Sequence, residues 1–333
     1  MVQVAFPVSP LVENVFNHLN INIMNNFFSL SFRRFLPVVR VFSLFIILFM
    51  VGFPGKVSAK GGSKFGGVQV GAITYSFRSM PDQSAEAYLN YIVQSGISSV
   101  ELMGDVAERF AGIPQGTKDA EVIRKWRTSV SMDKFKELRK LYKSKGVAIH
   151  MLKLGDKSWT DAEIDYAFNA CKAVGAVGIS MEIGEDAAKR MEPFAEKHKL
   201  YVIFHNHLQP GDPNFSFDKI LALGSMLRLN FDAGHYFGAT GLNPCLLIER
   251  LHGKIISIHI KDKTGPKAAE PNKNQSFGKG ETPVNEMLQL VQKNKWPIYC
   301  DIELEYTVPK ESDAVKETTK CVEYCKAALV PSK

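Results

Sequence analysis

Strand-like and helix-like segments alternate eight times along this chain from Gly67 onward. Short runs rich in β-branched residues are typical of buried strands, and apolar residues at helical spacing are typical of the helices that cover them. The expected strands are Val68–Phe77, Ser98–Met103, Val147–Leu154, Val177–Ile183, Tyr201–His207, Leu227–Asp232, Ile255–Lys261 and Pro297–Glu305. The expected helices are Ser84–Ser95, Met132–Ser144, Thr160–Ala173, Glu185–Lys197, Phe217–Leu223, Asn243–Leu251, Val284–Lys293 and Lys310–Ala328. This order predicts βα units that share one parallel sheet.

The number of βα units favours a closed barrel over an open sheet. Eight units in about 260 residues match a single-domain (β/α)8 TIM barrel of the α/β class, whereas a doubly wound sheet usually has five or six strands. No GxGxxG motif follows the first strand, so a dinucleotide-binding fold is not indicated. A long irregular insert is expected at roughly 105–131, after the second strand, where such barrels carry active-site loops.

The N-terminal segment differs in composition from the barrel segment. Three arginines, Arg33, Arg34 and Arg40, precede an apolar run at 41–53, and the small-residue site Val57-Ser58-Ala59 follows it. This order is typical of a secretory signal peptide. We therefore expect residues 1–59 to be a signal peptide with an N-terminal extension, residues 60–333 to form the barrel domain, and the mature protein to be exported to the periplasm. Met24 is an alternative start to Met1.

The charge of the mature chain does not indicate a polyanionic partner. The full sequence carries a formal charge of +7, and removal of residues 1–59 leaves about +4. No Lys/Arg cluster with interleaved aromatic residues is present, so nucleic acid is not expected as a partner. The apolar run at 41–53 is shorter than the ~20 residues that a spanning helix needs, so we expect no stable membrane association after cleavage.

Polar side chains follow or end nearly every expected strand. In a TIM barrel the C-terminal ends of the strands meet at one mouth, so these side chains are candidates for binding and catalysis. They are Glu101, His150, Glu182, His205, Asn206, His207, Asp232, His235, His259, Lys261, Glu303 and Glu305. For a single residue the alternative is a structural role at a strand end. For Glu101 this structural role is as plausible as substrate binding. For His150 the structural role is favoured, because a lone histidine on an apolar strand is often a satisfied core residue.

Three of these residues lie on neighbouring strands and predict a metal site. Asp232, His259 and Glu303 belong to the sixth, seventh and eighth expected strands. Ionisable groups inside an apolar strand pattern are costly unless they are paired or bound to a cation. Mixed carboxylate and imidazole ligands suit Mn²⁺, Co²⁺, Mg²⁺ or Zn²⁺, and the ligand types do not choose among these divalent metal ions.

The motifs around these residues resemble a known family. The segments FHNH, NFDAGH, SIHIKD and IELE, with the loop SFGKGETP at Ser276–Pro283, resemble the xylose isomerase-like barrels over about 68–329. That group includes ketose 3-epimerases, hydroxypyruvate isomerase, inosose dehydratase and dehydroshikimate dehydratase. The resemblance implies that Asp232, His259 and Glu303 bind one metal ion. It also implies that His235, Lys261 and His207 contact substrate oxygens.

The fifth expected strand departs from the family pattern. The family typically has a glutamate ligand there, whereas this chain has His205-Asn206-His207 and no carboxylate. We expect His205 to be the fourth metal ligand, with Glu182 at the end of the fourth strand as the alternative. In the epimerases a pair of glutamates usually moves the proton. Because this chain lacks the glutamate of the fifth strand, the departure also weakens the prediction of a simple epimerase mechanism.

The expected reaction begins with removal of a proton next to a carbonyl, which gives an enediolate. Glu303 is the expected base, with His205 or Glu182 opposite it, and Lys261 and His235 are expected to stabilise the oxyanion. The residues expected to act in catalysis are Glu303, Glu182, His207, His235 and Lys261. Those expected to bind the substrate are Glu101, His150, Asn206 and Glu305.

The predicted protein is thus a sugar isomerase or epimerase acting on a small-molecule sugar or keto-sugar. One alternative is a keto-sugar dehydratase or lyase of the inosose dehydratase type, which the strand-five histidine favours. A non-catalytic sugar-binding barrel is less favoured, because binding alone does not require a carboxylate-rich metal cluster. A divalent-metal nuclease is weaker still, since the chain lacks a basic groove. The sequence leaves the sugar, the metal and assembly into a homo-oligomer open.

Overall fold

The protein is described by a computed structural model that covers residues 62–330. The predicted signal peptide at 1–59 and the choice between Met1 and Met24 lie outside these residues and stay predictions. No helix within residues 62–330 has the length and apolar content that crossing a membrane requires.

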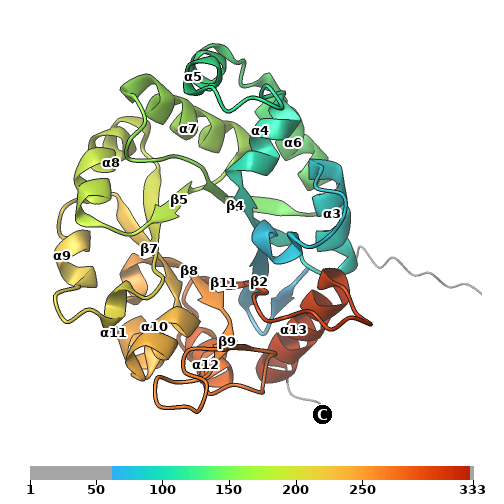
Figure 1. Ribbon diagram of the computed structural model, residues 1–333. Coiled ribbons are helices and arrows are strands. Elements are labelled where there is room, and N and C mark those ends of the chain that lie inside the picture. The colour runs from blue at the N-terminus through green and yellow to red at the C-terminus, as the bar shows by residue number, and fades with distance from the viewer. Residues whose placement is uncertain (1–61, 331–333) are drawn as a thin grey trace, which may run out of the picture. The chain divides into compact units, whose positions relative to one another are not determined.

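Eight parallel strands form a closed barrel (Figure 1). They are β2 (Val68–Ile73), β3 (Ser99–Met103), β4 (Ala148–Lys153), β5 (Gly178–Glu182), β6 (Tyr201–His205), β7 (Leu227–Asp232), β8 (Ile255–Ile260) and β11 (Tyr299–Ile302). Each strand pairs with the next in chain order, and β2 pairs with both β3 and β11, which closes the sheet on itself. The prediction of a (β/α)8 barrel is confirmed, and each expected strand overlaps an observed one.

Helices surround the barrel and cover its outer face (Figure 1). The expected helices correspond to α3 (Ala85–Gln94), α6 (Asp133–Ser144), α7 (Asp161–Val174), α8 (Glu185–His198), α9 (Phe217–Leu221), α11 (Pro244–Leu251), α12 (Val284–Asn294) and α13 (Ala314–Leu329). Several begin at side chains that accept a hydrogen bond from the first turn. Ser84 caps α3, Asn243 caps α11, and Thr160 forms a reciprocal capping box with Glu163 at α7.

Strand alternation sends apolar side chains outward and polar ones into the barrel. The ring of Phe231 on β7 packs edge-on against Phe217 of α9, with 5.9 Å between ring centroids. Because successive side chains of a strand point to opposite faces, its neighbours Asn230 and Asp232 point into the barrel. All three β7 residues are fully buried. The outer helices therefore complete an apolar layer, and the interior is left for polar groups.

Two helices replace the irregular insert expected at 105–131, and that expectation was wrong. Helix α4 (Gly104–Ala111) follows β3 directly, and α5 (Ala120–Ser129) begins after Asp119, whose side chain accepts hydrogen bonds from the first turn. Helix α5 has no buried residue, and its apolar side chains Val122, Ile123 and Trp126 stay at least partly exposed. Helix α10 (Ala233–Thr240) was also not predicted, because its two glycines weaken the helical pattern.

Strands β2 and β11 end several residues earlier than expected, and a serine side chain hydrogen-bonds the chain at the end of β11. Strand β2 stops at Ile73 and continues as the 3-10 turn η1 (Thr74–Phe77). Within this turn, Ser76 Oγ donates to the carbonyl of Ile302 at 3.1 Å and accepts from the amide of Leu304 at 3.0 Å. Strand β11 ends at Ile302, and the two glutamates of the IELE motif follow it in a loop.

Shorter elements complete the described part of the chain. Strand β1 (Lys64–Phe65) runs antiparallel to β2, and β9 (Asp262–Lys263) pairs with β10 (Asn274–Gln275) in the long loop after β8. The 3-10 turns η2 (Gln209–Gly211) and η3 (His252–Lys254) lie after β6 and before β8. The β9–β10 pair lies after the C-terminal end of β8, which is the end of a TIM barrel where substrates usually bind.

Candidate metal centre

Four buried side chains from four adjacent strands converge in the barrel. His205 ends β6, Asp232 ends β7, His259 lies in β8 and Glu303 follows β11. Each offers one ligand atom, and these four atoms all lie within 4.8 Å of one another. The structure thus brings together the three residues expected on neighbouring strands, and His205 as the fourth.

Two carboxylate oxygens form the centre of this group. Glu303 Oε2 lies 2.8 Å from Nδ1 of His259, and Asp232 Oδ2 lies 3.3 Å from Nε2 of His205. The same two oxygens are each 3.9 Å from the imidazole of the other pair. Two oxygens and two nitrogens therefore face one point, an arrangement suited to a divalent ion.

Asp232 is held in place through its backbone and its second oxygen. Its Oδ1 accepts a hydrogen bond of 2.7 Å from the amide of His235 and so caps α10. The Asn206 side chain donates to the Asp232 carbonyl at 3.1 Å and accepts from its amide at 3.0 Å. Asn206 is fully buried, so the structure gives it a positioning role in place of the expected substrate contact.

Glu101 lies behind His259 and fixes the orientation of its ring. Its Oε2 is 2.6 Å from His259 Nε2 and accepts a hydrogen bond of 2.9 Å from Asn230. Burial alone would raise the pKa of Glu101, but the charge and hydrogen bond of His259 lower it to about 2. A carboxylate on the far nitrogen of a ligating histidine selects the tautomer and strengthens the ligand. Glu101 was expected to bind substrate; in the structure its Oε2 supports His259, and its Oε1 has no hydrogen-bond partner among the described residues.

Lys261 contacts the oxygens that a metal ion would use. Its Nζ lies 2.9 Å from Asp232 Oδ2, 2.8 Å from Glu303 Oε2 and 2.7 Å from Glu305 Oε2. Burial alone would lower the pKa of Lys261, but these three carboxylates raise it. Lys261 is therefore charged, and its ammonium group compensates the negative charge of the buried carboxylates.

The same pairing keeps the carboxylates ionised. Burial alone would raise the pKa of Asp232 and of Glu303, but Lys261 and the neighbouring histidines hold both below the ordinary value. Burial alone would lower the pKa of His259, but Glu303 and Glu101 on its two sides raise it well above the ordinary value. The donor set fits a divalent ion, which would compete with Lys261 for the carboxylate oxygens and with a proton for His259 Nδ1.

Glu182, His207 and His235 lie at the more exposed rim of the centre. His207 Nδ1 is 2.9 Å from Glu182 Oε2, and both side chains are about half exposed. The ring of His235 lies 5.0 Å from that of His207, and its Nε2 is 3.7 Å from Glu305. Burial, opposed by Asp232, lowers the pKa of His235 to about 4, so this imidazole is neutral at pH 7. Three of the expected catalytic residues, Glu182, His207 and His235, therefore lie beside the four ligands.

Comparison with known proteins identifies the family. Residues 89–325 match the family model described as xylose isomerase-like TIM barrel. The chain belongs to this family. The resemblance seen in the sequence motifs is thereby confirmed. Comparison with curated proteins finds no match.

Solved structures share the xylose isomerase-like fold at low sequence identity. A sugar phosphate isomerase/epimerase from Parabacteroides distasonis is 15% identical, with a TM-score of 0.56 over 80% of this chain and 95% of that chain. The IOLI protein with a zinc atom is 12% identical, with a TM-score of 0.53 over 80% and 100%. The probable 3-DHS dehydratase AsbF from Bacillus anthracis is 16% identical, with a TM-score of 0.56 over 77% and 99%. At these identities the likeness shows the fold alone.

His150 lies apart from the metal ligands of this xylose isomerase-like barrel. Its Nε2 is 2.8 Å from Asp301 and its Nδ1 is 2.9 Å from Ser99. Its ring stacks on Tyr299 at 4.0 Å. With both nitrogens engaged and 3% of its surface exposed, His150 is placed as a core residue, as the alternative to its expected substrate contact describes.

The site residues missed from sequence are those that support ligands. Asn230 donates to Glu101 and also lies 2.9 Å from His259 Nε2, and Lys153 donates to Glu182 at 2.9 Å. A signal for Asn230 existed: it precedes Asp232 by two residues in the NFDAGH motif, so it points to the same face of the strand. Lys153 gave no signal beyond its place at the end of a strand.

Proposed function

We propose that the protein is a divalent-metal-dependent sugar isomerase or epimerase that removes a proton next to a carbonyl. The observation that carries the proposal is the buried group of His205, Asp232, His259 and Glu303, with Lys261 against its two carboxylates. The isomerase/epimerase named among the structural neighbours and the zinc named with the IOLI protein are consistent with it.

His205, Asp232, His259 and Glu303 would hold the ion, which supplies a Lewis acid that polarises the substrate carbonyl and acidifies the adjacent C–H. In this proposal Glu303 receives that proton. Its contacts with His205, His259 and Lys261 all use Oε2, which leaves Oε1 for the substrate. General-base catalysis requires this direct reach to the proton.

In this proposal Lys261 and His235 stabilise the oxyanion that forms as the proton leaves. Lys261 is charged and His235 is a neutral imidazole whose N–H is available as a donor. Glu182 and His207 form a pair beside His205, and this pair would return a proton. Return to the neighbouring carbon isomerises the sugar, and return to the opposite face epimerises it.

A second candidate is a keto-sugar dehydratase. Two observations favour it: β6 supplies His205 where the family pattern has a glutamate, and one structural neighbour carries the name of a dehydratase. The same enediolate would then lose a β-hydroxyl as water, with the Glu182–His207 pair as the proton donor. The geometry of the ligands is common to both reactions and does not favour the dehydratase over the isomerase.

Metal analysis followed by a substrate panel tests the proposal. The purified protein should contain one divalent ion, and aldoses, ketoses and keto-sugars should be followed by proton NMR in deuterated water. An isomerase or epimerase exchanges deuterium into a product that has otherwise kept all its atoms, whereas a dehydratase releases water. Glu303→Gln should abolish exchange. Full activity of the metal-free protein would contradict the proposal.

A further inference from the structure

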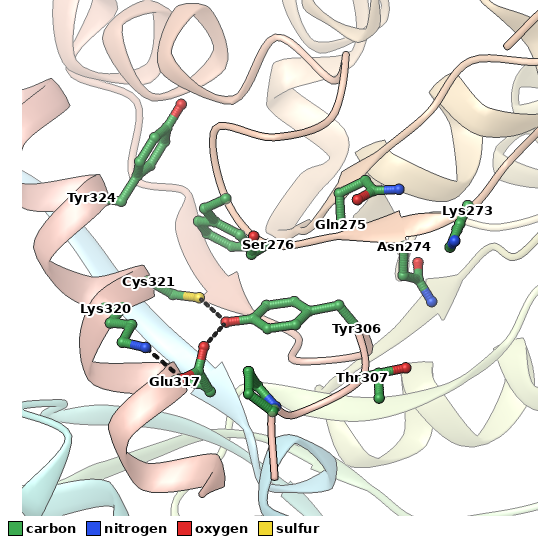
Figure 2. A pocket seen from close by; sticks show the side chains of 12 residues that line it. Lys273, Asn274, Gln275, Ser276, Tyr306, Thr307, Glu317, Lys320, Cys321 and Tyr324 are labelled. Atoms are coloured by element: carbon green, nitrogen blue, oxygen red, sulfur yellow. Dashed lines mark hydrogen bonds and ion pairs between the residues drawn. The ribbon is translucent and has the colours of Figure 1, made fainter. Parts of the chain in front are cut away.

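A cavity whose lining includes none of the proposed metal ligands lies between β10 and α13 (Figure 2). Its volume is about 570 Å³, within the usual range of small-ligand pockets. One wall is the segment 273–277, which includes β10, and the other is the part of α13 from Glu317 to Tyr324. Both walls belong to segments that follow the C-terminal end of a barrel strand, where TIM barrels bind their substrates.

Asn274 and Glu305 connect this cavity to the metal centre. Asn274 lines the cavity, and its Nδ2 lies 3.5 Å from Glu305 Oε2. The same Glu305 oxygen contacts Lys261, which touches two of the expected metal ligands. The next residue, Tyr306, lines the cavity. A ligand that occupies both places would therefore pass beside Asn274 and Glu305.

Contacts between lining residues hold the walls of the cavity together. The hydroxyl of Tyr306 donates to Glu317 Oε2 at 2.8 Å, and Figure 2 shows the tyrosine reaching across to α13. The rings of Phe277 and Tyr324 pack edge to face with 5.7 Å between their centroids. These contacts join the two walls, so little ordering remains for the binding step.

The lining combines aromatic rings with uncharged polar groups. Phe277, Tyr306 and Tyr324 offer ring surface, and hydroxyl and amide groups come from residues such as Ser276 and Gln275. The Oδ1 of Asn274 is buried and accepts no hydrogen bond within the described residues. A buried acceptor of this kind is costly unless a ligand or water donates to it.

The cations of the lining are already paired. Lys320 contacts Glu317 at 2.6 Å, and Lys273 forms an ion pair with Glu270. The cavity therefore has no free positive charge among its described lining residues to select a phosphate or a carboxylate. Aromatic faces with uncharged donors and acceptors match a ring that carries hydroxyl groups on its edge and C–H groups on its faces.

We propose that this cavity binds a second, uncharged sugar ring, so that the substrate class is a disaccharide or glycoside with its reacting ring at the metal centre. The inference rests on the proposed function. The cavity would hold one sugar ring, and the glycosidic link to the reacting ring would lie beside Asn274 and Glu305.

Calorimetric titration of the metal-loaded protein tests the inference. The probes are cellobiose, lactose and maltose, each compared with glucose and galactose. At least one disaccharide should bind about tenfold more tightly than its component sugars, which corresponds to about 1.4 kcal/mol. Ser276→Trp should fill the cavity and remove this preference without changing monosaccharide or metal binding. Thr307→Trp, at the exposed edge of the cavity, is a second filling variant if the first does not fold.

Ser129→Trp is the matched control, because Ser129 ends α5 and lies outside the cavity lining. It should keep the disaccharide preference of the unaltered protein. The inference is overturned if monosaccharides bind and no disaccharide binds more tightly, or if the preference survives both filling variants. Loss of all sugar binding by a protein that carries its metal would instead count against the proposed function, and the inference would fall with it.

Discussion

Lys261 decides the charge balance of the metal centre. Its ammonium is in contact with three carboxylates, and two of their oxygens are the expected metal ligands. Two cations close to the same oxygens repel each other, and this repulsion is strong in a buried site. The lysine therefore stabilises the metal-free protein and opposes metal binding at the same time.

Replacing Lys261 by methionine should separate these two effects. The metal-free variant should lose about 3–5 kcal/mol of unfolding free energy, because the buried carboxylates lose their partner. Its affinity for Mn²⁺ or Zn²⁺ should rise by about tenfold or more, since no ammonium competes for the oxygens. Thermal unfolding with chelator and calorimetric metal titration measure the two changes. Unchanged metal affinity would show that Lys261 and the ion do not share these oxygens.

Asp232→Asn tests the ligand itself. Asparagine keeps the oxygen that caps α10 and the two hydrogen bonds from Asn206 to the backbone, so the barrel should remain folded. Metal affinity should fall by more than about 10-fold. Loss of a residue that only supports a metal ligand already costs at least about that much, and Asp232 is expected to be a ligand itself. The rise in melting temperature on metal addition should shrink accordingly. Circular dichroism checks the fold, and an unaltered metal titration would remove Asp232 from the ligand set.

At the scale of elements, α5 is attached to the barrel by a buried ion-pair network. Helix α5 has no buried residue, yet its Arg127 reaches Glu108 of α4 at 2.7 Å and Glu163 of α7 at 3.4 Å. The guanidinium also lies over the ring of Trp159, 3.8 Å from its centroid. One side chain thus joins the helix to three other segments.

Arg127→Ala should release α5 while the barrel stays intact. Removing one partner of a buried pair leaves Glu108 and Glu163 uncompensated, at a cost of about 3–5 kcal/mol. Hydrogen exchange measured by mass spectrometry should increase in residues 117–131 and not in the barrel strands. Arg127→Lys keeps the charge but loses the two-pronged contact with Glu108, so its exchange should be intermediate. Equal protection of α5 in all three proteins would contradict this account.

At the scale of the whole molecule, we propose that residues 1–59 export the barrel and are then removed. The basic residues, apolar run and small-residue site support the proposal. The native protein should begin near Lys60 and be found outside the cytoplasm. N-terminal sequencing of protein from fractionated cells measures both properties. Recovery of residues 24–59 on a soluble cytoplasmic protein would rule the proposal out.

The sequence by itself determined the strand order, the barrel and the candidate ligands. Strand identity is a local property, because β-branched runs and turn residues set it over a few positions. Once eight βα units are counted, the barrel follows, and every strand end lies at one mouth. Asp232, His259 and Glu303 could therefore be selected from residue type and position alone.

Only the tertiary structure decided which polar residues reach the centre and which support it. The depth of a side chain in a barrel depends on strand tilt and on the pairing register, which involve residues far apart in the chain. His150 and Asp301 are 151 positions apart, and their contact keeps His150 in the core. Asn206, Glu101 and Lys261 likewise took their roles from partners on other strands. Closure of the strands into a barrel brought those partners together, whereas the local sequence pattern did not indicate them. The barrel fold also formed the cavity beside Asn274.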